Sequence, residues 1–459
     1  MGDIYSTASE VLIWLGRENE FEDTTAALRM IDALRCCVTP RFSELQAIEN
    51  LGQFSNVEEE FGIPDVRSQE FRALSGFLNR PWFSRAWTFQ ESILARKRKF
   101  YIGDRTISSQ VLEDAQWALF ALWNCTNVPE FHEGFNQQRA ILLYEKDDKD
   151  DKHEIFTLLN LLWIRRGSGH TNPVDLIYSL LGTAHDNVPI DVDYSKPMEI
   201  VYAETALNLI QHSGNLAVLS RLHGNRQQVV GIPSWVPDWR DACSQNKFLM
   251  EPILTHLFSA AGSSKPRHHL SNDKMELTLE GIIVDKIVGT MEWSRVDHTH
   301  MSDDEWIRLL SADHNQSGNS EGLPVRLPKR KFTLDDTQLS GSTKLPSKDA
   351  CIDLILQGAN HTRYMWTETG KIGHVDCIME AGDIIVILLG GQVPFVLKPQ
   401  ATGKYILLSQ CYVQDYMDGY GLVEARIQTD PGYDGRDISW LKRLDKDAIP
   451  FSTQKFTLI

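Results

Sequence analysis

The chain has 459 residues, of which 42% are hydrophobic and 24% charged, so it has the composition of an ordinary globular protein and is long enough for two or three domains. A net charge of −16 disfavours general binding to nucleic acid or anionic membranes, because both require a basic surface. No apolar run approaches the roughly 20 residues needed to span a bilayer, and the first residues lack the basic and apolar regions of a secretory signal, so we expect a cytoplasmic protein.

The first predicted element is residues 11–16, a continuous apolar run ending in glycine. Such a run is typical of a parallel strand that is buried on both faces. It lies so early in the chain that no earlier strand can pair with it, which predicts an incomplete sheet with an exposed edge. Asp23 or Thr24 can then cap a helix whose apolar stripe runs from Ala27 to Leu34.

The most distinctive stretch is residues 79–91, which combines four large aromatic residues, two arginines and a Gln-Glu pair around Pro81. Proline must end the helix predicted over 68–79, and a new helix is expected from 84 to 95. A carboxylate beside a tryptophan needs a charged partner, so this block is interpreted as a buried, hydrogen-bonded anchor. That interpretation predicts that Trp87 is largely buried and that Glu91 accepts hydrogen bonds from an arginine or from backbone N–H groups.

Further along, the sequence predicts a hairpin over 98–107 around Gly103-Asp104, followed by several amphipathic helices. The helices are expected at 109–122, 135–144, 154–166, 172–182 and 196–212. From about residue 244 the pattern changes to strands, expected at 275–288, 362–367, 383–389, 394–398 and 404–413. These strands would form a small antiparallel barrel or sandwich.

The chain therefore reads as an α+β protein whose helical N-terminal half precedes a small, antiparallel barrel-like β domain. The stretch at 314–348 is rich in Ser, Gly, Asn, Lys and Pro, which indicates a mobile linker or insertion. The predicted regions are 1–125, the helical 126–243, the β-rich 244–313 with 349–425, the linker 314–348, and a C-terminal tail at 426–459.

Three blocks of the sequence together resemble the fungal heterokaryon-incompatibility (HET) domain family. They are Val11-Leu12-Ile13-Trp14-Leu15-Gly16, then Arg80-Pro81-Trp82-Phe83-Ser84-Arg85-Ala86-Trp87-Thr88-Phe89-Gln90-Glu91, then Asp175-Leu176-Ile177-Tyr178-Ser179-Leu180-Leu181-Gly182. The residues that this resemblance marks as a structural motif are Arg80, Trp82, Arg85, Trp87, Gln90, Glu91, Asp175 and Tyr178. Residues 1–125 would then be the C-terminal part of such a domain, because the family's upstream Ser-Tyr-x-Trp-Gly and Trp-Ile-Asp blocks are absent from this sequence.

The resemblance also implies a partial α/β sheet, because the family's domain looks distantly like the flavodoxin-like TIR fold. Some proteins with that fold cleave NAD⁺ with a glutamate, and Glu91 is the candidate here. One departure concerns the third block, where the family often has Asp-Pro-Arg-Asp and this chain has Asn172-Pro173-Val174-Asp175, without the arginine.

Three functional hypotheses follow. The first is a protein of fungal non-self recognition and programmed cell death that acts through contacts with protein partners of unknown identity. The second is a TIR-like NAD⁺ hydrolase that uses Glu91, and the third is an inactive, truncated remnant. The sequence has no P-loop, nucleophile elbow or zinc-protease motif, and its seven cysteines are scattered without Cys-x-x-Cys spacing. We therefore prefer the first hypothesis, with a structural role for Glu91, no metal and no cofactor.

Overall fold

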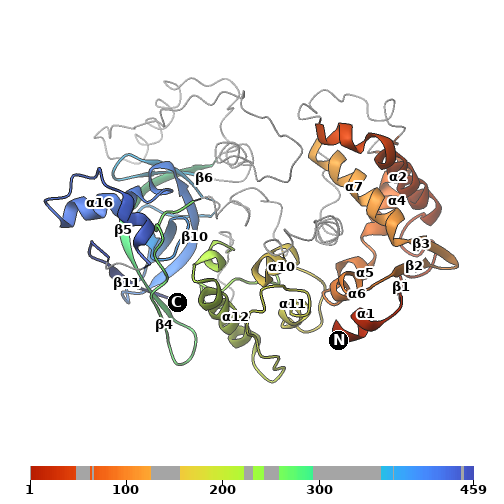
Figure 1. Cartoon of the computed structure of the whole chain (residues 1–459), viewed down its shortest axis with the longest axis horizontal. Helices are drawn as coiled ribbons and strands as arrows, with labels where there is room; N and C mark the ends of the chain where they lie inside the picture. The colour runs from red at the N-terminus through yellow and green to blue at the C-terminus, as the bar shows by residue number, and fades with distance from the viewer. Residues whose placement is uncertain are drawn as a thin grey trace. The chain divides into compact units, whose positions relative to one another are not determined.

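The computed structural model describes residues 2–47, 63–64, 67–125, 156–221, 231–241, 258–292, 363–375, 377–445 and 449–459, and it mixes helices and strands (Figure 1). The expected α+β composition is therefore present. Contacts divide the chain into two units. Unit 1 contains residues 1–192, 239–242 and 338–344, and unit 2 contains 193–238, 243–337 and 345–459. The predicted helix at 135–144 and the predicted linker at 314–348 lie outside the described residues.

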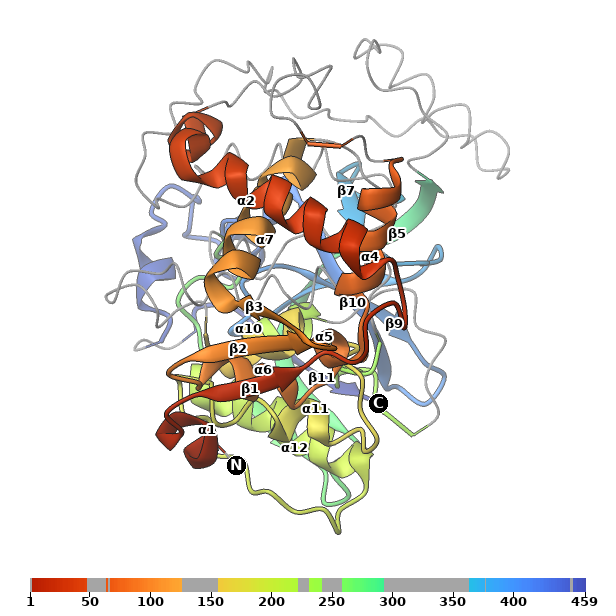
Figure 2. The same cartoon turned by 90° about the vertical axis from the view of Figure 1, so that its right-hand side faces the viewer.

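Unit 1 contains a three-stranded sheet in the order β1-β2-β3 (Figure 2). Strand β1 (Val11–Trp14) pairs in parallel with β2 (Arg98–Ile102), which continues through the predicted hairpin into the antiparallel β3 (Arg105–Ser108). Gly103 has a positive φ of 53°, as the tight turn between β2 and β3 requires. Within the described residues β1 pairs only with β2, so the predicted edge is present there.

The prediction that β1 is buried on both faces is wrong. Ile13 and Leu15 are buried, whereas Leu12 and Trp14 keep 63% and 57% of their surface exposed. Only one face of the sheet is covered, because its apolar side chains join a core built with three helices. These helices are α2 (Thr24–Ala47), α4 (Gln69–Leu78) and α7 (Ser109–Cys125).

The remaining helices of unit 1 are short. They are α1 (Gly2–Thr7), α5 (Pro81–Ser84), α6 (Thr88–Ile93), α10 (Leu158–Ile164) and α11 (Asp175–Tyr178). Thr157 caps α10 by accepting from the Asn160 N–H at 3.4 Å, and Val174 precedes α11 without a side-chain cap. The apolar residues of helix α11 are buried, with Ile177 at 0% exposure.

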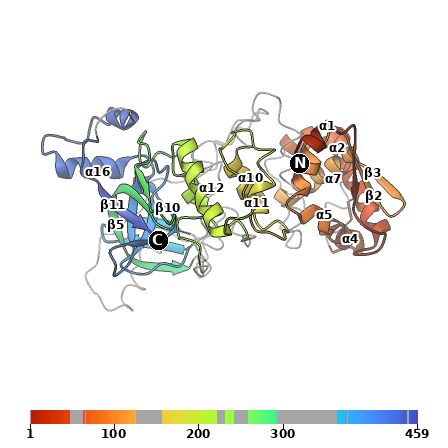
Figure 3. The same cartoon turned by 90° about the horizontal axis from the view of Figure 1, so that it is seen from below.

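Unit 2 contains an eight-stranded sheet within the described residues, organised around one long strand, β5 (Leu277–Glu292) (Figure 3). Strand β5 lies at the strand predicted over 275–288, and four other strands also lie where the sequence predicted them. They are β6 (Arg363–Thr367), β8 (Ile384–Leu388), β9 (Phe395–Pro399) and β10 (Tyr405–Val413). Three more were not predicted, namely β4 (His268–Leu270), β7 (Ile372–Val375) and β11 (Gln454–Leu458).

The pairings in unit 2 return to their starting strand. β5 pairs with β8, β8 with β9, and β9 with β10, all antiparallel. β10 then pairs in parallel with β11, and β11 pairs antiparallel with β5. Each strand of this circuit therefore has neighbours on both sides, and all five residues of β8 are buried.

Helix α12 (Met198–Ser213) confirms the long helix predicted after Pro197, and Gly214 ends it in the left-handed conformation at φ 65°. A further helix, α16 (Tyr420–Thr429), and a 3₁₀ turn at Ser439–Arg443 pack against the strands of unit 2. Trp235 and Trp239, which lie close to Pro233 and Pro237, are buried at 0% and 2% exposure. Among the described residues, no helix is long and apolar enough to cross a membrane.

Candidate functional site

The tryptophan-rich block forms two short helices rather than the single predicted helix from 84 to 95. Helix α5 begins at Pro81, whose fixed φ suits a first helical position. It ends at Arg85, which is extended at ψ 144°. The reason is a bridge to another part of unit 1, in which the Gly169 N–H donates to the Ser84 carbonyl at 2.7 Å and the Ala86 N–H donates to the Gly169 carbonyl at 2.9 Å. Helix α6 begins only after this bridge.

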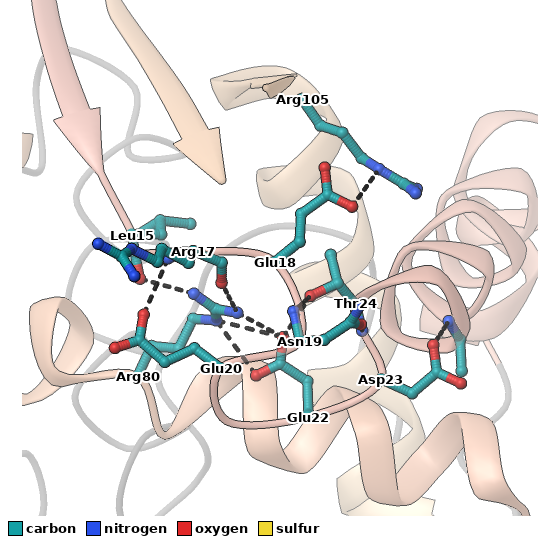
Figure 4. Close-up of polar contacts among 11 residues, drawn as sticks. Leu15, Arg17, Glu18, Asn19, Glu20, Glu22, Asp23, Thr24, Arg80 and Arg105 are labelled. Atoms are coloured by element: carbon teal, nitrogen blue, oxygen red, sulfur yellow. Dashed lines mark hydrogen bonds and ion pairs between the residues drawn. The ribbon is translucent and has the colours of Figure 1, made fainter. Parts of the chain in front are cut away.

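Arg80 is the buried centre of this region, with 0% of its surface exposed. Its Nη2 donates to the Glu22 carboxylate at 2.8 Å, and its Nε contacts both Glu22 oxygens at 3.1 and 3.2 Å (Figure 4). Its Nη1 also donates to the Leu15 carbonyl at 2.7 Å, and Nη2 donates to the Arg17 carbonyl at 3.0 Å. The guanidinium is thus held by one buried carboxylate and two carbonyls at the end of β1, which links α5 to the sheet.

The loop between β1 and α2 supplies the groups that contact Arg80, and its conformation is fixed by a glycine and by internal hydrogen bonds. Gly16 has φ 110°, and a Cβ there would lie 2.9 Å from the Glu20 carboxylate and 3.1 Å from Arg80 Nη1. Asn19 and Thr24 exchange hydrogen bonds, with the Asn19 N–H donating to Thr24 Oγ1 at 2.9 Å and the Thr24 N–H donating to Asn19 Oδ1 at 3.0 Å. Figure 4 shows these side chains turned toward the same loop.

Glu91, the candidate catalytic residue, is half-buried and contacts side chains of unit 1. Its Oε1 accepts from the Tyr5 hydroxyl at 3.2 Å, and its Oε2 accepts from Trp82 Nε1 at 3.1 Å. Among the described residues, its hydrogen-bond donors are therefore a phenol and an indole rather than the predicted arginine or backbone N–H groups. Burial raises the pKa of Tyr5, and the neighbouring Glu91 charge raises it further.

The other residues of the predicted motif separate into buried and exposed positions. Trp87 is half-buried rather than largely buried, because it caps α6 at the point where the chain leaves the Arg85 bridge. The Arg85 side chain is exposed, although its carbonyl accepts from Arg165 at 2.9 Å. Gln90 is buried, and its Nε2 lies 3.0 Å from the position of a Cβ on Gly182.

The contact between Gln90 and Gly182 brings together the second and third blocks of the sequence, because Gly182 ends the segment that contains α11. Within that segment Tyr178 is buried and Asp175 half-buried at the start of the helix. The structure thus places Trp82 and Glu91 in direct contact and Gln90 against the third block, whereas Arg80 lies with Glu22 instead. A glycine at position 182 leaves room for this close approach, since a Cβ there would be in tight contact with the Gln90 amide.

Three participating residues were missed by the sequence reasoning, namely Tyr5, Glu22 and Arg165. A buried arginine requires a carboxylate, and the acidic loop after Gly16 was the available signal for Glu22. Tyr5 and Arg165 left no comparable pattern. Among the described residues there is no group of three or more His, Cys, Asp or Glu side chains that could hold a metal ion. What this arrangement does is fix the chain locally, by connecting β1, α5, α6 and the third block.

Comparison with known proteins then identifies the two ends of the chain. Residues 1–91 match the family model described as heterokaryon incompatibility protein (HET), and this match contains both the β1 segment and the tryptophan-rich block. Residues 349–429 match the model described as the Het-6 β-barrel domain. Both models describe parts of heterokaryon-incompatibility proteins, as the resemblance of the sequence blocks implied.

One relative extends the similarity over most of the chain. It is heterokaryon incompatibility protein 6, OR allele, of Neurospora crassa, which is 22% identical over an alignment of 544 residues that covers 91% of this chain and 78% of the relative. No solved structure matches the chain. The resemblance that the three sequence blocks indicated is therefore confirmed at the level of the family.

Proposed function

We propose that the chain acts in fungal non-self recognition, as a heterokaryon-incompatibility protein that triggers programmed cell death through contacts with other proteins. The observation that carries this proposal is the presence in one chain of both matched domains, together with the similarity to heterokaryon incompatibility protein 6 over 91% of the sequence. The geometry agrees with a structural role for the motif, because Arg80 and Glu91 are both engaged by neighbouring groups of unit 1.

The proposal extends to the folds of the two units. The parallel pair β1 and β2, joined through helices, supports a partial flavodoxin-like or TIR-like sheet in unit 1. The closed circuit of pairings supports a barrel in unit 2. The region boundaries predicted at 125, 243, 313, 348 and 425, and a cytoplasmic location, belong to the same proposal.

Inducible expression of the chain in fungal hyphae tests the function. We expect growth arrest and uptake of a vital dye by the expressing compartments, compared with a control that carries a premature stop codon. Normal growth of hyphae that accumulate the folded chain would contradict the proposal. The TIR-like NAD⁺-hydrolase alternative predicts a different result. Purified protein would then consume NAD⁺, and the Glu91→Gln variant would not. Cell death that persists in Glu91→Gln, without NAD⁺ consumption by either protein, supports action through contacts.

A further inference from the structure

The sheet of unit 1 has two faces of opposite character. The register pairs Leu12 with Lys99 and Trp14 with Tyr101, so these four side chains lie on one face because side chains alternate along a strand. We call this the open face. The opposite face carries Ile13 and the other apolar side chains that pack against α2, α4 and α7. Parallel strands are ordinarily covered on both faces, which makes the exposure of Leu12 and Trp14 unusual.

The open face also carries positive charge. Lys99 Nζ lies 5.4 Å from the centre of the Tyr101 ring, and the exposed Lys97 lies in the bend just before β2, where its carbonyl accepts from the Val11 N–H at 2.8 Å. Within the described part of the chain, no ion pair is formed by Arg96, Lys97 or Lys99, and Glu10, which is exposed just before β1, forms none with them. Arg98, between the two lysines, points to the other side and pairs with Glu113 at 2.7 Å.

The open face thus combines two exposed apolar side chains, Leu12 and Trp14, with the positive charges of two lysines. A partner that fits it must be apolar on one side and acidic beside it. We propose that the open face binds an acidic amphipathic helix of another protein. Neighbouring strands lie about 4.8 Å apart and a helix with its side chains is about 10 Å wide, so one helix covers both rows. Its apolar stripe would pack on Leu12 and Trp14, and its acidic residues would face Lys97 and Lys99.

The same observations disfavour three other occupants. A strand added at the free edge would have β1 between itself and the lysines, so the charges would not be used. A second copy of the chain, bound through the same face about a two-fold axis, would bring the lysines of both copies into one interface without adding an acidic partner for them. An anionic bilayer presents its charge to a much larger part of the protein surface than one helix does, so it would meet the net charge of −16 as well as the two lysines.

A labelled synthetic helix of about 18 residues, with leucines on one face and glutamates beside them, tests the proposal by fluorescence anisotropy with the full chain. A helix with lysines in place of the glutamates and a scrambled acidic peptide serve as controls. We expect only the acidic helix to bind, and more weakly as salt rises from about 50 mM to about 300 mM. The double variant Leu12→Ser/Trp14→Ser and the double variant Lys97→Glu/Lys99→Glu should each weaken binding by about tenfold or more.

Matched control variants remove exposed groups in unit 2. Tyr194→Ser deletes an exposed aromatic ring (53% exposed) and Lys442→Glu reverses an exposed charge, and both should bind the acidic helix like the unaltered chain. Circular dichroism of every variant confirms that it is folded. Equal binding of the scrambled peptide, absence of binding, or insensitivity to the open-face variants would overturn the proposal. So would a dimer in light scattering that Trp14→Ser dissociates, or binding to phosphatidylserine vesicles that is lost in the same variant.

The inference rests on the proposed function only in assuming that the chain works through a protein contact, and the two can fail separately. If hyphae die on expression but the acidic helix does not bind, the open-face assignment is wrong and the function stands. If the helix binds but expression leaves hyphae healthy, the surface stands and the function is wrong.

Discussion

The two units differ in how the edge strands of their sheets are paired and in which groups contact their buried charges. In unit 2 the pairings from β5 through β8, β9, β10 and β11 close on β5, and β8 is buried along its whole length. In unit 1, β1 has one described neighbour and exposes Leu12 and Trp14. Unit 1 also buries an arginine with its carboxylate partner, whose side chains are 0% and 3% exposed, whereas the buried Asp285 of unit 2 accepts from the hydroxyls of Thr369 and Tyr416. Unit 2 is therefore stabilised by an apolar sheet in which the strands of this circuit are paired on both sides, whereas unit 1 contains a buried ion pair and leaves Leu12 and Trp14 exposed on one face of its sheet.

The largest expected difference in stability is between substitutions of two aromatic residues, one buried in unit 2 and one exposed in unit 1. Phe395 in β9 is 0% exposed and Trp14 in β1 is 57% exposed. We expect Phe395→Ala to lower the free energy of unfolding by about 3–5 kcal/mol, because it leaves a cavity in the core. Trp14→Ala should change it by less than about 0.5 kcal/mol, as exposed substitutions do. Urea unfolding of the two variants measures both, and a large loss for Trp14→Ala would show that the open face is covered in the isolated chain.

Removal of the buried Arg80–Glu22 ion pair of unit 1 should lower the free energy of unfolding by almost as much. Arg80→Ala leaves the Glu22 carboxylate buried without its partner, which should cost about 3–5 kcal/mol of stability. The control is Arg105→Ala, because Arg105 pairs with Glu18 at 3.0 Å with both side chains partly exposed. That substitution should cost less than about 1 kcal/mol. Equal losses for the two variants would mean that the Arg80 pair does not hold unit 1 together.

Local sequence signals predicted much of both units, and their failures have physical causes. Alternation and glycine turns located four strands of unit 2, but β11 could not be found because only its pairing with the distant β5 makes it a strand. The apolar run of β1 correctly predicted a parallel strand, yet an apolar run cannot reveal whether one face or both are covered. In the tryptophan-rich block, Pro81 correctly ended the preceding helix.

The candidate site was less predictable than the fold. Position in the sequence placed Glu91 near Arg85, but the carboxylate instead meets Tyr5, which is 86 residues away. The break between α5 and α6 depends on Gly169, a residue outside the block. Long-range contacts of this kind leave no local spacing, so the motif residues could be recognised from the sequence whereas their partners could not.

A smaller effect is expected where Glu91 meets α1. Tyr5→Phe removes only the hydroxyl that donates to Glu91 at 3.2 Å. Because the pair is partly exposed, the loss should be about 0.5–1.5 kcal/mol, and Tyr420→Phe, which removes an exposed hydroxyl, should cost less. Thermal unfolding of the two variants gives the comparison. If Tyr5→Phe is neutral while Glu91→Gln abolishes cell death, Glu91 acts in something other than anchoring α1.

The smallest expected effect concerns a buried acid of unit 2 and depends on pH. Asp383 lies just before β8, is 3% exposed, and accepts from the Glu380 N–H at 2.8 Å. Burial raises the pKa of this carboxyl above its usual value, so the folded state binds its proton more tightly than the unfolded state. The stabilisation is present at low pH and is lost as the pH rises through the raised pKa. Asparagine at this position keeps an acceptor for Glu380 without ionising.

Asp383→Asn should therefore gain stability relative to the unaltered chain between about pH 4 and about pH 7. Urea unfolding at several pH values measures the difference, with Asp415→Asn, which alters an exposed acid, as the control. A variant that instead loses stability relative to the unaltered chain over this range would show that ionised Asp383 stabilises unit 2. Lys398, which pairs with Glu380 at 2.7 Å, would then be the cation to examine, since its charge favours ionised Asp383. In that case both units would stabilise their buried charges by pairing, and the contrast between them would be reduced to the edges of their sheets.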